Sequence, residues 1–234
     1  MQTDSQTVLT KSTATIRAYE AIAGTIVWLA LILQFYLITT VSIAKGLGLW
    51  VGTVRYFGFF TILTNILVAL AFTVPLILPR SRWGQFFSHA NVRTAIAVYI
   101  TVVGITYSLL LRHIWNPEGW QLVADRILHD VTPILYVVFW FLFVPKSTLQ
   151  WRNLPAWLIY PLVYVIVALI RGAIFNWYPY PFLEVSKLGY PQVLLNTVML
   201  SVGFCVISAI FIGIARLTQR DRQTRAYLQS PDVV

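Results

Sequence analysis

The sequence predicts an all-α integral membrane protein, built as a bundle of six transmembrane helices. Apolar residues make up 58% of its 234 residues and charged residues only 11%, whereas soluble domains carry about a quarter charged residues. The apolar residues gather in six segments that are long enough to cross a bilayer. No segment alternates as the strands of a membrane β-barrel do, and backbone groups cannot stay unpaired in lipid, so we expect helices.

Short stretches rich in glycine, proline and charge separate the six segments, so consecutive helices should be antiparallel neighbours. The first apolar run follows Lys11 and Arg17 and is too long for the core of a cleaved signal peptide. We expect a cytoplasmic N-terminal segment at 1–17, one six-helix domain at 18–215 and a basic cytoplasmic tail at 216–234. The expected helices are 18–43, 56–78, 93–112, 124–144, 155–175 and 191–215.

Lysine and arginine are divided unevenly between the two sides that these segments define. Because basic residues favour the cytoplasmic side, the side with more of them should be cytoplasmic, with both termini there. One side holds 11, namely Lys11, Arg17, Arg80, Arg82, Arg93, Lys146, Arg152, Arg216, Arg220, Arg222 and Arg225, and the other holds 6, namely Lys45, Arg55, Arg112, Arg126, Arg171 and Lys187.

The net charge of +9 does not indicate nucleic-acid binding, because the basic residues flank apolar segments, where lipid headgroups explain them. Cys205 is the only cysteine, which excludes a disulfide framework and a cysteine metal cluster. His89 and His113 lie in other segments than His129, so a zinc site or a bis-haem site is not expected. We expect no metal and no organic cofactor.

His129 is the most informative residue, because it lies in an apolar stretch, 127–144, that reads as a membrane span. Ionisable residues in such a span are costly and mostly face the bundle interior or a wet cavity. Asp125, four residues earlier, shares its helical face and could hold the imidazole in one tautomer, or could be a solvated cap. Asp130 points about 100° away from that face.

Thr61, Thr64 and Asn65 share one face of the second expected helix. Thr61 should lie about 9 Å below Arg55, and His129 about 5 Å below Arg126, so the two residues share a depth near the outer boundary of the bilayer. Histidine can remove the proton that keeps a threonine hydroxyl a weak nucleophile. The alternative is that these polar groups only bond to neighbouring helices or to their own carbonyls.

Further candidates for binding a substrate lie on the same predicted side. Thr64 and Asn65 could donate hydrogen bonds to an oxyanion or hold a water. Tyr107, Arg171 and Tyr180 could bind a carboxylate or an oxyanion, and Arg171 is the best carboxylate partner on charge grounds.

Short blocks spread over residues 18–215 resemble a known family, namely Phe60-Thr61, Thr64-Asn65, Leu128-His129, Thr132-Pro133, Trp140, Tyr160-Pro161, Tyr164, Arg171-Gly172 and Tyr178-Pro179-Tyr180-Pro181-Phe182. The chain looks like a bacterial-type relative of the androgen-induced protein and androgen-dependent TFPI-regulating protein family. That resemblance implies a multi-pass hydrolase of fatty-acid esters of hydroxy fatty acids. It also implies a threonine nucleophile, which falls on Thr61 with Thr64 in reserve, and a catalytic histidine, which falls on His129.

We therefore expect an intramembrane lipid-ester hydrolase of the bacterial plasma membrane, whose partners are its lipid substrate and membrane lipids. Two other classes stay open. One is a small-molecule or proton-linked transporter that uses His129, Asp125 and Asp130 as a relay, although the two halves of the chain show no internal repeat. The other is a non-catalytic membrane scaffold.

Overall fold

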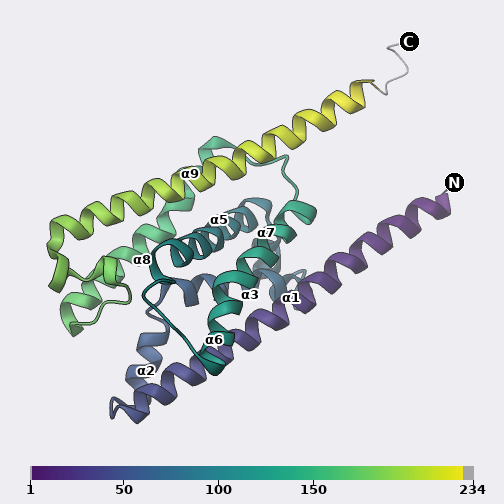
Figure 1. Ribbon diagram of the computed structural model, residues 1–234. Helices are drawn as coiled ribbons and strands as arrows, with labels where there is room; N and C mark the ends of the chain where they lie inside the picture. Colours follow the sequence, from purple (N-terminus) through teal and green to yellow (C-terminus); the bar gives the residue numbers. More distant parts are fainter. Residues whose placement is uncertain (1, 229–234) are drawn as a thin grey trace. The chain divides into compact units, whose positions relative to one another are not determined.

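A computed structural model shows that the chain is helical over most of its length (Figure 1). The structure describes the backbone of residues 2–228 and the side chains of residues 13–219, so most of the basic C-terminal tail lies outside the described side chains. No strand occurs within residues 2–228. The α-helices of the described residues are α1 (Gln2–Ala44), α2 (Gly48–Tyr56), α3 (Phe60–Ile77), α4 (Arg82–Ser88), α5 (Ala90–Thr106), α6 (Gly119–Arg126), α7 (Thr132–Phe143), α8 (Leu154–Phe175) and α9 (Val185–Leu228).

Six helical stretches are long and apolar enough to cross a membrane, which confirms the predicted fold class of a multi-pass integral membrane protein. Each begins and ends within a few residues of the predicted segment; the second is shorter than predicted and the other five are longer. The spans are Thr13–Ala44, Phe60–Ile77, Ala90–Leu111, Gly119–Phe143, Trp151–Phe175 and Val185–Gln219.

Two short helices that the sequence analysis did not predict, α2 and α4, lie between spans. Each carries an exposed tryptophan, Trp50 on α2 and Trp83 on α4, as is common where a protein meets the headgroup region. Helix α2 packs closely on α1 at Gly52, where an added Cβ would lie 2.9 Å from the Cα of Thr39. That close approach explains why a glycine stands there.

The described chain falls into two compact units that divide after Phe143. In the first unit α5 is the most buried span; α3 and α7 pack against it, and α1 packs against α3 and α7. Aromatic rings fill the space between α1, α3 and α7. The centroid of the Phe72 ring lies 5.1 Å from the ring centroids of both Tyr136 and Phe139. The Tyr19 ring contacts the rings of Phe72, Phe139 and Phe143.

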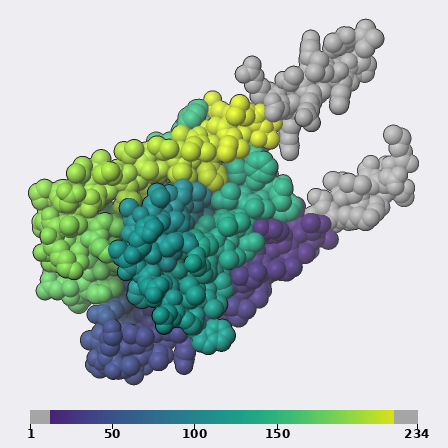
Figure 2. Space-filling model, in the orientation of Figure 1, coloured from purple at the N-terminus to yellow at the C-terminus, as the bar shows by residue number. Residues whose placement is uncertain are grey.

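The second unit contains α8, α9 and the connection between them. Ala168, Leu183 and Val193 form its buried core, and Asn196 of α9 donates a hydrogen bond to the carbonyl of Phe182 at 2.9 Å. A non-helical glycine, Gly189, interrupts α9 near its start. Much of the outer surface of α9, the yellow-green helix in Figure 2, consists of exposed apolar side chains such as Leu194, Val198, Met199, Val202 and Val206, as lipid contact requires.

Candidate functional site

Two π-helical turns lie against each other in the first unit, and each carries one residue of the candidate site. The turn η1 (Tyr107–Leu111) extends α5, and η2 (Ile127–Val131) joins α6 to α7. Gly104 lies in α5, just before η1, and faces η2: an added Cβ would lie 3.2 Å from the carbonyl oxygen of His129 and 3.2 Å from the Pro133 ring. Single π turns within α-helices occur frequently at functional sites.

Pro133 explains part of the irregular hydrogen bonding at η2. The N–H of Thr132 bonds to the carbonyl of Ile127, five residues earlier, so the next carbonyl, that of Leu128, would need the N–H of residue 133. Proline has no N–H to give. Asn65 of α3 supplies the missing donor, because its Nδ2 lies 3.2 Å from the Leu128 oxygen.

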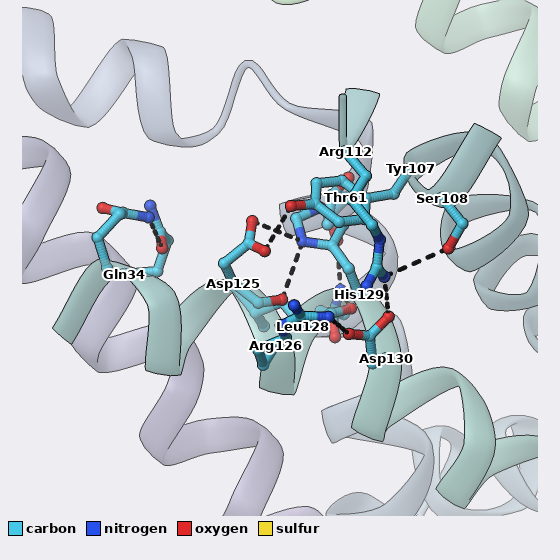
Figure 3. Close-up of polar contacts among 12 residues, drawn as sticks. Gln34, Thr61, Tyr107, Ser108, Arg112, Asp125, Arg126, Leu128, His129 and Asp130 are labelled. Atoms are coloured by element: carbon cyan, nitrogen blue, oxygen red, sulfur yellow. Dashed lines mark hydrogen bonds and ion pairs between the residues drawn. The ribbon is translucent and has the colours of Figure 1, made fainter. Parts of the chain in front are cut away.

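Asn65 also fixes the first turn of α3 beside η2. Its Nδ2 donates a second hydrogen bond to the carbonyl of Thr61 at 2.9 Å, so one amide joins the Thr61 backbone to the residue before His129. Thr61, Thr64 and Asn65 are all buried, in agreement with their predicted shared inward face. Figure 3 draws Thr61 in the same group of polar contacts as His129.

The His129 imidazole is held through one nitrogen. Its Nδ1 lies 3.0 Å from the backbone oxygen of Asp125 and 3.2 Å from the carboxylate Oδ1 of the same residue (Figure 3). A carbonyl oxygen can only accept a hydrogen bond, so Nδ1 carries the proton in the neutral ring. In that tautomer Nε2 carries the free lone pair, so Nε2 is the nitrogen that can act as a base.

Asp125 is buried, with 4% of its surface exposed, which excludes the alternative of a solvated helix cap. Its second carboxylate oxygen accepts a hydrogen bond from the Tyr107 hydroxyl at 2.5 Å. The Tyr107 ring stacks on the His129 ring with 3.8 Å between centroids. Two donors, the Tyr107 hydroxyl and the His129 ring, therefore compensate the buried carboxylate. One turn earlier in α6, Gln121 donates a 2.9 Å hydrogen bond to Gln34 of α1.

The Tyr107 hydroxyl bonds to Asp125, a contact that the sequence did not predict. Its predicted role as a substrate contact stays a prediction. Sequence reasoning missed the contact with Asp125 because it depends on how α5 packs beside α6, although a tyrosine at the end of a span that also holds polar residues was a partial signal.

Three charged residues form a rim beside the imidazole. Asp130 points away from the Asp125 face, as predicted, and bonds to both Arg112 and Arg126, with 2.9 Å to the latter. All three side chains are partly exposed. The Arg112 guanidinium carbon lies 5.1 Å from the centre of the Tyr107 ring, which places positive charge close to the stacked rings.

Arg171 and Tyr180, two of the predicted binding residues, belong to the second unit. Arg171 lies over the Trp177 ring at 4.9 Å, and Tyr180 stacks on Phe182 at 5.1 Å. Gly172 allows the Tyr178 ring to lie directly against α8, since any Cβ there would overlap that ring. Their predicted role as substrate contacts stays a prediction.

The remaining histidine with a described role is structural: His89 caps α5, accepting a 3.3 Å hydrogen bond from the N–H of Asn91 through its Nδ1. Within the part of the chain that the structure describes, no group of three or more His, Cys, Asp or Glu residues could hold a metal ion.

Comparison with protein-family models finds no match. No curated protein matches the chain, and no solved structure matches it either.

Proposed function

We propose that this protein is an intramembrane lipid-ester hydrolase with Thr61 as nucleophile and His129 as acid and base. The observation that carries the proposal is the Tyr107–Asp125–His129 arrangement, in which the buried Tyr107 and Asp125 hold one nitrogen of the half-buried imidazole and leave the other as a base. Buried ionisable residues are costly in a membrane span. As in serine hydrolases, a buried aspartate accepts the Nδ1 proton of the histidine and orients its ring. The resemblance of the sequence to a family of membrane threonine hydrolases supports the same assignment.

In the proposed reaction Nε2 of His129 takes the Thr61 hydroxyl proton while the Thr61 oxygen attacks the ester carbonyl. The imidazolium that forms is stabilised by the Asp125 carboxylate and returns its proton to the departing alcohol. A water molecule, activated by the same nitrogen, then hydrolyses the acyl-threonine and regenerates both side chains. Each proton that leaves a nucleophile therefore passes through Nε2.

The negative charge that develops on the ester oxygen needs donors. Thr61 stands in the first turn of α3, and the beginning of a helix carries partial positive charge from its backbone N–H groups. The backbone there is held by Asn65, so this charge stays in place relative to His129. We assign Asn65 a positioning role, because its Nδ2 is used by two carbonyls, and keep Thr64 as the reserve nucleophile.

The substrate class follows from the surroundings of the site. Exposed apolar side chains on the spans suit acyl chains, and the partly exposed Arg112–Asp130–Arg126 rim suits an anionic head group. Fatty-acid esters that carry a free carboxylate, such as esters of hydroxy fatty acids, combine both features. We place this site near the outer face of the bacterial plasma membrane, with both termini in the cytoplasm.

A fluorophosphonate probe and an ester-hydrolysis assay on the purified protein test the proposal. Thr61→Ala should abolish covalent labelling, and His129→Ala should abolish both labelling and turnover. Thr101→Ala is the matched control, because its hydroxyl bonds only to its own helix, at 2.7 Å from the Ala97 oxygen. Unchanged labelling in Thr61→Ala combined with loss in Thr64→Ala would move the nucleophile to Thr64, and unchanged labelling in all of these variants would end the proposal.

A further inference from the structure

Among the described residues of the first unit, four buried polar atoms have no hydrogen-bond partner. One is Nε of Arg112, in the rim beside His129, and the other three are Oδ1 of Asn65, Oγ1 of Thr132 and the hydroxyl of Tyr136. All three residues have 0% of their surface exposed. More than nine in ten buried polar groups in proteins are paired, so an unpaired one calls for a missing partner such as an internal water. Three of them on fully buried residues of one unit call for a common explanation.

The orientation of the Asn65 amide is fixed by its neighbours. Its nitrogen lies within hydrogen-bond distance of two carbonyl oxygens, those of Thr61 and Leu128. Exchanging the oxygen and nitrogen of the amide would place an acceptor against two acceptors, so the exchange is excluded. Oδ1 is therefore an acceptor that lacks a donor.

The three atoms come from facing surfaces of α3 and of the η2–α7 segment. Asn65 reaches the carbonyl of Leu128, and seven residues later along α3 the Phe72 ring packs on the Tyr136 ring at 5.1 Å. Thr132 lies four residues after Leu128 and four before Tyr136, so it occupies the turn between these two contacts. The unpaired atoms therefore follow one line along the interface.

This line leads from the candidate site to a buried ion pair. At one end Leu128 adjoins His129, whose ring is held by Asp125. At the other end the Arg93 guanidinium lies over the Phe139 ring at 5.0 Å, and its Nη2 is 2.7 Å from the Glu20 carboxylate. Phe139 itself packs on Tyr136, so a single ring separates Tyr136 from the Arg93 guanidinium.

We propose that a file of internal water molecules occupies this line, from Asn65 Oδ1 past Thr132 and Tyr136 to the Arg93–Glu20 ion pair. An internal water needs two to four polar partners, and the unpaired atoms together with the ion pair supply them. Water in this file donates to Asn65 and exchanges hydrogen bonds with the two hydroxyls. The file gives the Asp125–His129 pair a route for protons through the interior of the first unit, whatever substrate the site takes.

Radiolytic hydroxyl-radical labelling with mass spectrometry tests the file on the intact protein in detergent, since buried side chains are labelled when bound water lies against them. Tyr56 is the matched dry control: it has 4% of its surface exposed, and its hydroxyl donates to the Leu31 carbonyl at 2.9 Å. We expect Tyr136 to be labelled several-fold faster than Tyr56, and Thr132→Val to slow its labelling.

Thermal unfolding of Tyr136→Phe gives an independent result. Removing a hydroxyl that bonds to water should lower the Tm, whereas removing a dry, unpaired hydroxyl should raise it. Labelling of Tyr136 no faster than that of Tyr56 overturns the proposal, and so does a raised Tm in Tyr136→Phe. Neither result bears on fluorophosphonate labelling of Thr61, so failure here is distinguishable from failure of the hydrolase proposal.

Discussion

At His129, the position of a single proton decides which nitrogen can act as a base. The backbone oxygen of Asp125 already requires the proton on Nδ1, and the carboxylate of the same residue adds charge that stabilises an imidazolium. The two contacts therefore have separable effects. One sets the tautomer of the resting ring, and the other lowers the energy of the protonated ring.

Asp125→Asn should separate these effects. The backbone contact survives, but the charge is lost, and the new amide can donate to Nδ1 and favour the wrong tautomer. We expect kcat for ester hydrolysis to fall by roughly 10²–10⁴-fold, with little change in KM. Glu118→Gln, the same change at an exposed residue before α6, is the control and should leave kcat unchanged. Equal kcat in Asp125→Asn and wild type would remove Asp125 from the mechanism.

Tyr107→Phe should act first on stability. The substitution keeps the ring but takes away the donor to Oδ2 of Asp125, which leaves a buried carboxylate oxygen without its partner. Such a loss costs about 1–3 kcal/mol, so the Tm measured in detergent should fall. Tyr190→Phe, at a residue with 55% of its surface exposed, should not change the Tm. A Tm in Tyr107→Phe equal to the control would show that the hydroxyl contributes nothing.

The individual polar residues of the site could be predicted from the sequence, but most of their partners could not. Thr61, Asn65, Asp125 and His129 stand out because polar groups are rare in apolar spans. The Asp125 contact was open to prediction because both residues lie one turn apart on one helix. The Tyr107 and Asn65 contacts link different helices, 18 and 63 residues apart, and depend on packing that no local pattern encodes.

At the level of helices, the approach of α5 to the η2–α7 segment depends on Gly104. Gly104→Ala should push the two apart, because the new Cβ would lie 3.2–3.3 Å from the His129 oxygen and the Pro133 ring. We expect a loss of about 1–3 kcal/mol in stability and a lower kcat as His129 shifts. Gly203→Ala in α9 has open space and should raise the Tm, because alanine favours a helix. Equal effects of the two substitutions would contradict this account.

The Arg93–Glu20 ion pair joins α5 to α1, and both side chains are buried. Arg93→Met alone should cost about 3–5 kcal/mol in unfolding free energy, because it leaves Glu20 buried without its partner. Adding Glu20→Leu should recover much of that loss. Lys187→Met breaks a pair in which Lys187 is 74% exposed, and should cost about 1 kcal/mol or less. Urea or thermal unfolding would give the unfolding free energies of these variants. An equal loss of stability in Arg93→Met and in the double variant would show that the two residues do not stabilise the fold as a pair.

The helices themselves were more predictable than their contacts. Span lengths follow from runs of apolar residues, which are local, and all six spans were expected near their observed positions. The short helices α2 and α4 were missed because they are brief and lie in connections that read only as glycine-rich and charged. The π turn at His129 was not predicted, since its register depends on Pro133 together with a donor from α3.

For the whole molecule, an even number of spans places both termini on the same side of the membrane. The excess of lysine and arginine on that side predicts that it is the cytoplasm. Reporter fusions at both ends should therefore give cytoplasmic signals, while a fusion after Asn176, beyond α8, should report the other side. Opposite signals from the two ends would mean that one of the six stretches does not cross.

The division into two compact units could not be read from the sequence. Composition and hydropathy are similar on both sides of Phe143, and they record which segments enter lipid rather than which segments contact each other. Six of the predicted site residues fall in the first unit and two in the second. The two proposed catalytic residues, Thr61 and His129, both lie in the first unit. Their grouping depends on how the helices pack, which hydropathy does not encode.

The two π turns also carry a genetic consequence. A π turn accommodates one surplus amino acid without lengthening the helix, so every side chain beyond it is rotated relative to those before it. Deleting one codon within 127–131 would restore an unbroken α-helical phase and swing the later side chains of that span by about 100°. Insertion and loss of single residues, rather than exchange of one side chain for another, would then be the quickest way for this bundle to gain or lose its polar centre.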